Sequence, residues 1–295
     1  MNLIPRLLLR YRRAWVVLRD TVEGVLADGF THAGNLAYLS LLTLFPFFIV
    51  LATVAGSMGR TADGLRAVNA FLRTLPPDVA ALVAKPIADV IGVRASGGLL
   101  TFGIIVTLWT VSGFMETIRA IIRESYKSPT SMPLWRYRLG SVAVIFVAVI
   151  VMLVALASQV VLTGAETFVT RLMPFAEGIF TMLGIGRVVP AALLFGALYA
   201  VFFVLTPKRF RVMAAPIWPG ALVTMVTWVG TTMGMPWALG LLGGYTLTYG
   251  SLAGVIVALL FFYIIGLGLV VGANLNAALA KARQRRLKTT VTTKE

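Results

Sequence analysis

The sequence predicts an all-α polytopic membrane protein: a bundle of six transmembrane helices, with an N-terminal amphipathic interfacial helix and short helices in the first outer loop. Two observations predict the bundle. Nearly half of the 295 residues lie in six long apolar runs, each close to the roughly 20 residues that a helix needs to cross a bilayer. Basic residues gather on alternate connections between the runs, which are 33–56, 97–122, 140–163, 188–206, 214–239 and 250–272.

The distribution of lysine and arginine predicts the orientation of the chain. They cluster before the first run, between the second and third, between the fourth and fifth, and after the sixth. The positive-inside rule then places both termini in the cytoplasm. The formal net charge is +15, and its bias to one face indicates anionic lipid headgroups as partners rather than nucleic acid.

This distribution divides the chain into three parts. Residues 1–32 form a cytoplasmic amphipathic lead-in, residues 33–280 the six-span membrane domain with an outer loop at about 57–96, and residues 281–295 a basic cytoplasmic tail. The lead-in is expected to lie along the inner membrane surface, either as an anchor or as a gate or docking element. Apolar residues recur in it at steps of three and four, and these are Leu8, Tyr11, Trp15, Leu18, Val22 and Val25.

Ionisable residues inside the apolar runs are the main lead to function, because each costs roughly 2.5 to 3.5 kcal/mol in hydrocarbon. Glu116 lies about two turns from the inner end of the second run, and Arg119 follows three residues later on the same face. The two side chains can therefore offset each other's charge. The alternative is that Glu116 only locks this helix to a neighbour while Arg119 reaches the headgroups.

Other polar residues are expected at the same depth. The first run leads outward and the sixth run leads inward, so polar residues at their cytoplasmic ends approach Glu116 and Arg119. A shared polar pocket opening inward is one interpretation, and a set of interhelical hydrogen bonds is the other. The candidate pocket residues are His32, Asn35, Tyr38, Glu116, Arg119, Asn274 and Asn276.

Proline and glycine indicate breaks in the helices. Proline inside a helix removes an amide donor and frees a carbonyl, so the sequence predicts helix kinks at Pro46, Pro216, Pro219 and Pro236. The last outer connection is uncharged and rich in glycine and hydroxyl groups, which suits either a tight cap or a re-entrant lining. Its outer hairpin includes Tyr245, Tyr249, Gly250 and Ser251.

The sequence offers little for enzyme chemistry. His32 is the only histidine, the eleven carboxylates are scattered, and there is no cysteine. No pair of carboxylates has the spacing to hold two metal ions, and no glycine-rich phosphate loop precedes a Lys and a Ser or Thr. We therefore expect no enzyme activity, no metal and no cofactor.

The chain resembles the YihY/virulence factor BrkB family of bacterial inner-membrane proteins, formerly mislabelled ribonuclease BN. The resemblance runs from Asp28 to Ala278 and implies a six-helix protein of the bacterial inner membrane. That family commonly has Glu where this chain has Asn274, which puts in doubt any proton or cation role of that position here. The motifs are 33–38, 44–46, 75–76, 108–109, 219–221, 249–253 and 272–277.

Two functions fit these observations best. One is a transporter or flippase-like protein for a lipid or another amphipathic envelope molecule, because the spans offer few charges to replace the hydration of a small ion. The other is a non-transporting scaffold for envelope integrity, with a second copy or other envelope proteins as partners. If transport depends on Glu116, replacing it with Gln is expected to abolish flux in proteoliposomes while the protein stays folded.

Overall fold

The computed structural model describes residues 4–57, 97–128, 185–212, 215–241 and 252–292, with Asn69, Ala80 and Gly140 as single residues. Within these ranges the secondary structure is helical, without strands, which confirms the all-α prediction for this part of the chain. The third apolar run, the predicted helices of the first outer loop and the outer hairpin lie outside the described residues. The helices are α1 (Ile4–Ser57), α4 (Gly97–Ser125), α7 (Ile185–Leu205), α8 (Lys208–Val212), α9 (Trp218–Leu241) and α11 (Ala253–Thr292).

The helices coincide with five of the six predicted apolar runs. By length and hydropathy, Ala253–Arg285 is the one segment of the described residues that qualifies as a membrane span. Ala191–Leu205 is also apolar but shorter. The six-span bundle therefore stays a prediction.

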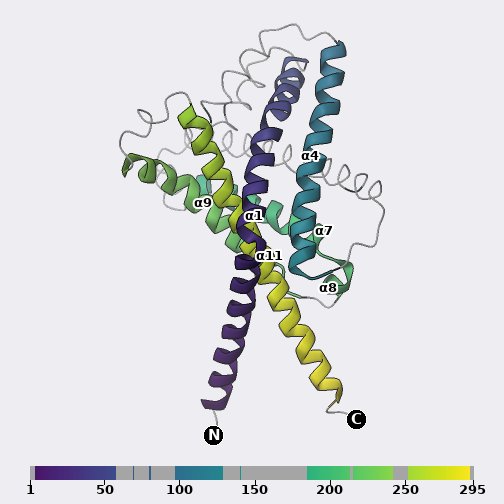
Figure 1. Cartoon of the computed structure of the whole chain (residues 1–295), viewed down its shortest axis with the longest axis vertical. Coiled ribbons are helices and arrows are strands. Elements are labelled where there is room, and N and C mark those ends of the chain that lie inside the picture. Colours follow the sequence, from purple (N-terminus) through teal and green to yellow (C-terminus); the bar gives the residue numbers. More distant parts are fainter. Residues whose placement is uncertain are drawn as a thin grey trace, which may run out of the picture.

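The lead-in and the first apolar run form a single helix, α1, of 54 residues. At about 1.5 Å per residue it is roughly 80 Å long. The boundary expected near residue 32 is therefore not a helix end, and the tail expected from residue 281 likewise continues α11 as far as Thr292. Helices α1 and α11 cross, and both chain ends lie at the same end of the molecule (Figure 1).

The four prolines occupy different positions. Pro46 and Pro236 lie inside α1 and α9 without ending them. Pro216 lies in the non-helical segment before α9, and Pro219 lies in the first turn of α9, where a helix has no use for the missing amide donor. Kinks at these residues stay a prediction.

Large apolar side chains point outward along most of the helices. Trp109 on α4 is 65% exposed and Trp237 on α9 is 71% exposed. Soluble proteins rarely expose large contiguous apolar patches, whereas exposed apolar side chains are at no disadvantage in lipid. This arrangement supports a membrane environment. Others exposed in this way are Trp15, Leu18, Val22, Leu26, Phe30, Phe102, Ile105, Phe203, Trp218, Leu222, Val226 and Met233.

A buried amide from α11 holds the beginning of α9. Asn276, which is 0% exposed, accepts a hydrogen bond from the Gly220 amide at 2.8 Å and donates one to the Ile217 carbonyl at 2.9 Å. Gly220 belongs to the first turn of α9, whose amides have no partner inside the helix. Ile217 precedes α9 and has no side-chain acceptor, so Asn276 supplies the cap from another helix.

The cap forms because the backbones of α9 and α11 approach each other closely. A Cβ at Gly220 would overlap the Asn276 side chain and the Gly272 carbonyl, and one at Gly272 would overlap the Gly220 carbonyl and Thr224. The Thr224 hydroxyl donates to the Gly220 carbonyl at 2.8 Å and approaches the Gly268 carbonyl at 3.3 Å. The two backbones therefore meet through glycine and hydroxyl contacts, as is typical of membrane helix pairs.

The described core lies where α1, α4, α7 and α11 meet. Leu36 of α1, Ile121 and Ile122 of α4, Phe202 of α7 and Val270 of α11 are almost fully buried in one cluster. Helix α1 packs closely on α11, since a Cβ at Gly24 would overlap the Asn274 side chain. This contact sets the separation of the two helices where their polar ends begin.

Replacing Asn276 with Ala is expected to destabilise the protein by about 2 kcal/mol, because it leaves a buried amide and a buried carbonyl without partners. The measurement is thermal unfolding of the purified protein in detergent. Asn274→Ala is the comparison variant and is expected to cost less, because among the described residues the Asn274 amide bonds only to the Val270 carbonyl of its own helix at 3.0 Å. Equal losses of stability for the two variants would show that the interhelical cap does not stabilise the protein.

Candidate functional site

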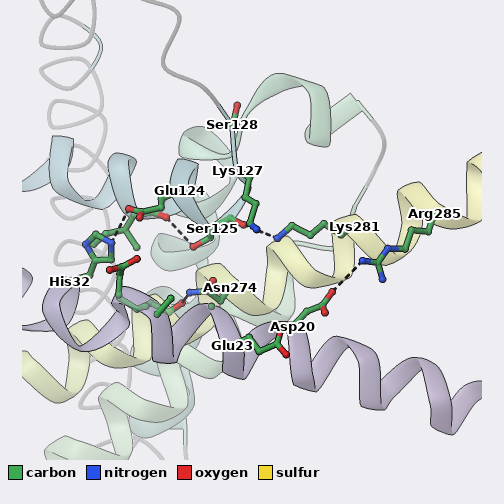
Figure 2. A pocket seen from close by; sticks show the side chains of 15 residues that line it. Asp20, Glu23, His32, Glu124, Ser125, Lys127, Ser128, Asn274, Lys281 and Arg285 are labelled. Carbon is green, nitrogen blue, oxygen red and sulfur yellow. Dashed lines mark hydrogen bonds and ion pairs between the residues drawn. The ribbon is translucent and has the colours of Figure 1, made fainter.

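A pocket of about 870 Å³ lies between α1, the end of α4 and α11. Most of its lining residues are polar or charged, and they come from three segments far apart in the sequence (Figure 2). The polar lining consists of Asp20, Glu23, Asp28 and His32 from α1, Glu124, Ser125, Lys127 and Ser128 from the end of α4, and Asn274, Lys281 and Arg285 from α11.

Charges of opposite sign come from different walls of the pocket. Helix α1 supplies Asp20, Glu23 and Asp28, which recur at steps of three and five residues on one side of the helix. Helix α11 supplies Lys281 and Arg285, one turn apart. Figure 2 shows His32 and Glu124 at one end of the pocket and Lys281 and Arg285 toward the other.

Two polar contacts connect the walls. His32 Nε2 lies 2.9 Å from Glu124 Oε2 and joins α1 to α4. Arg285 Nη2 lies 3.8 Å from Asp20 Oδ2 and joins α11 to α1. Glu124 and Arg285 are largely exposed, so each pair is expected to contribute at most about 1 kcal/mol. These contacts therefore orient the side chains more than they stabilise the fold.

The end of α4 places Lys127 in the pocket. The Lys127 amide donates to the Glu124 carbonyl at 2.8 Å, and the Ser128 amide donates to the Arg123 carbonyl at 3.0 Å. This is the Schellman arrangement of a helix end, whose left-handed residue is usually glycine. Here that residue is Lys127, with a φ of 49°.

Helix α11 also secures the end of α4. The Lys281 ammonium donates to the Ser125 carbonyl at 3.3 Å, and a cation is favourable at the carbonyl end of a helix. On the other side of this turn, the buried Tyr126 ring packs on Phe210 with 4.8 Å between ring centroids. Burial raises the pKa of the Tyr126 hydroxyl above its ordinary value, so this residue stays neutral at physiological pH.

The structure separates the seven residues of the expected polar pocket. His32 and Asn274 line the observed pocket, whereas the buried Asn276 caps α9. On α1, Asn35 is exposed and Tyr38 is 59% exposed. The remaining two residues, Glu116 and Arg119, are half-buried on α4, before the turn that reaches the pocket.

Most of the charged pocket residues were not among the sequence candidates. Asp20, Asp28 and Lys281 lie beyond the apolar runs, where an ionisable residue needs no explanation. The spacing of the acidic residues on one side of α1 was the available signal. Nothing in the sequence indicates that Glu124 or Lys127 faces them across the pocket. Among the described residues, no three side chains of the metal-ligating type lie together.

A chain whose described residues form helices, expose large apolar side chains and line a charged pocket has the features of a helical membrane protein. The chain belongs to the virulence factor BrkB family, whose model matches residues 25–294. The resemblance inferred from the motifs is thereby confirmed, and the protein is a bacterial membrane protein of this family.

Curated relatives match over most of the chain. A putative ribonuclease-like protein, YfkH, of Bacillus subtilis is 26% identical over 259 residues, covering 88% of this chain and 93% of the relative. A UPF0761 membrane protein of Alteromonas mediterranea is 26% identical over 262 residues, covering 86% and 84%. A UPF0761 membrane protein of Chromobacterium violaceum is 26% identical over 255 residues, covering 84% and 58%. No solved structure matches the chain.

Replacing Lys127 with Gly is expected to stabilise the protein by about 1 kcal/mol, because glycine adopts a positive φ without steric cost. The measurement is the thermal midpoint in detergent. Lys127→Ala removes the same ammonium but retains a Cβ, so its midpoint is expected not to rise. A lower midpoint for Lys127→Gly would show that the ammonium contributes more to folding than the backbone conformation costs.

Proposed function

We propose that this protein is a multi-pass transporter that moves a lipid or another amphipathic envelope molecule across the bacterial inner membrane. The observation that carries the proposal is the charged pocket of about 870 Å³, formed by helices whose outer surfaces are apolar. An amphipathic molecule needs both environments at once, because its headgroup requires polar partners while its chains remain in lipid.

The position of the pocket fits an entry site on the cytoplasmic side. Both chain ends lie at the same end of the molecule (Figure 1), and the pocket includes Lys281 and Arg285 from the C-terminal part of α11. The positive-inside rule assigns this basic end to the cytoplasm. In this orientation a headgroup from the inner leaflet reaches the pocket without first crossing the apolar core.

The size and chemistry of the pocket favour a headgroup over a small ion. Pockets for small molecules are typically about 300 to 1,000 Å³, and the observed volume is near the upper end. A bare ion needs a compact shell of ligands to replace its water, whereas the charged groups here come from both sides of a wide space. The non-transporting scaffold remains the alternative that the same experiment tests.

The test is lipid exchange between the leaflets of proteoliposomes that contain the full-length protein and fluorescently labelled phospholipid. We expect exchange at least tenfold faster than in protein-free liposomes, and a loss of most of this rate in Lys281→Gln, because the headgroup loses a charge-assisted hydrogen bond. Arg283→Gln is the matched control, since Arg283 lies on the same helix but does not line the pocket. Its rate is expected to stay within about twofold of wild type.

Two results would contradict the proposal. Exchange no faster than in empty liposomes, across several lipid classes, would favour the envelope scaffold. Equal losses in Lys281→Gln and Arg283→Gln would mean that the pocket has no special role. Glu116→Gln belongs in the same series, because an unchanged rate would remove Glu116 from the mechanism while leaving the pocket in it.

A further inference from the structure

The pocket contains two lysines that repel each other. Lys127 and Lys281 enter it from α4 and α11, and like charges that line one pocket repel each other. Among the described residues, neither lies within ion-pair distance of a carboxylate. Lys281 donates to the Ser125 carbonyl at 3.3 Å, and the Asp20 carboxylate attracts it without reaching ion-pair distance. An anionic oxygen between the two ammonium groups would relieve their repulsion and accept hydrogen bonds from both.

The carboxylates of the pocket differ in whether they form ion pairs. Asp20 pairs with Arg285, Glu23 pairs with Arg19 and Glu124 pairs with His32. Asp28 also lines the pocket and forms no ion pair with any residue that the structure describes. A ligand therefore finds one carboxylate and two ammonium groups that form no ion pair with any described residue.

The overall charge argues against a simple anion. Four carboxylates outnumber the permanent cations Lys127, Lys281 and Arg285 in the lining, so a free phosphate would be attracted at one wall and repelled at the other. A simple cation would be repelled by the two lysines. A ligand that carries a negative and a positive group a short distance apart satisfies both walls.

We propose that the pocket binds the phosphodiester-linked ammonium headgroup of a zwitterionic phospholipid of the ethanolamine type. Lys127 and Lys281 bind the phosphate, and Asp28 binds the ammonium. This inference rests on the proposed function in that it names the class of lipid. It is tested by binding alone, so it stands or falls separately from transport.

The experiment is isothermal titration of the purified full-length protein in detergent with two short-chain lipids. Dihexanoyl phosphatidylethanolamine carries the ammonium, and dihexanoyl phosphatidylglycerol has the same phosphodiester with hydroxyl groups in its place. We expect the ethanolamine lipid to bind about tenfold more tightly, the effect of one charge-assisted hydrogen bond. Equal affinity for the two lipids would overturn the proposal.

Variants test which residues bind the ammonium and which bind the phosphate of the headgroup. Asp28→Asn is expected to remove the preference for the ethanolamine lipid, while Lys281→Gln weakens both lipids about tenfold and leaves the preference intact. Lys127→Gly removes the second ammonium in a background expected to fold more stably, so weaker binding there does not reflect unfolding. A preference that survives Asp28→Asn would refute the assignment of the ammonium site, and Arg283→Gln is expected to bind as wild type does.

A third ligand distinguishes a lipid from a soluble compound. Glycerophosphoethanolamine has the same headgroup without acyl chains and is expected to bind at least tenfold more weakly than the lipid. Equal affinity would refute a lipid ligand in favour of a soluble phosphodiester. Binding without flux would refute transport alone, and flux without binding would refute this headgroup alone.

Discussion

The amide of Asn276 is the contact on which the arrangement of the helices depends. It bonds to an amide and a carbonyl at the beginning of α9, so α9 starts at a fixed point on α11. The same helix presents a second face to the pocket. Asn276 follows Asn274 by two residues, which is about 200° around a helix, and Lys281 and Arg285 continue the face of Asn274 at steps of seven and four residues. Fixing one face of α11 on α9 therefore orients the charged face toward α1.

Small residues allow α9 and α11 to approach closely enough for this hydrogen-bonded contact. Lipid chains are as apolar as leucine, so membrane helices gain little by burying apolar side chains against each other. They associate instead through close backbone approach and hydrogen bonds. Gly268, Gly272 and Asn276 recur every four residues and face α9, where Gly220 and Thr224 complete the contact. The apolar outer surfaces are then left for lipid, as the exposed tryptophans on α4 and α9 indicate.

The sequence predicted the helices better than the site. Long apolar runs report helix positions directly, because each must hide its own backbone from lipid. The uninterrupted α1 was harder to foresee, since a change from amphipathic to apolar sequence and Pro46 both resemble a boundary. Glu116 was predicted as a functional candidate because a charge inside an apolar run is energetically costly. The observed pocket uses charges just beyond the runs, where composition gives no signal.

Long-range register explains the rest of what the sequence could not show. The pair of His32 with Glu124 joins residues 92 positions apart, and the pair of Asp20 with Arg285 joins the two ends of the chain. Each depends on how far one helix is shifted along another. That shift follows from contacts such as Gly24 against Asn274, whose partners are identifiable only once the helices are packed.

The balance of charge in the pocket has a further physical consequence for a membrane protein. Moving one net charge across the membrane potential involves about 2.3 kcal/mol per 100 mV. A zwitterionic headgroup carries no net charge, so its passage is not driven or opposed by the potential. A pocket with an acidic wall on α1 and basic groups from α4 and α11 matches such a ligand without itself needing a large net charge. Exchange through it would therefore run in both directions and follow the lipid gradient, with no requirement for a nucleotide or a coupled ion.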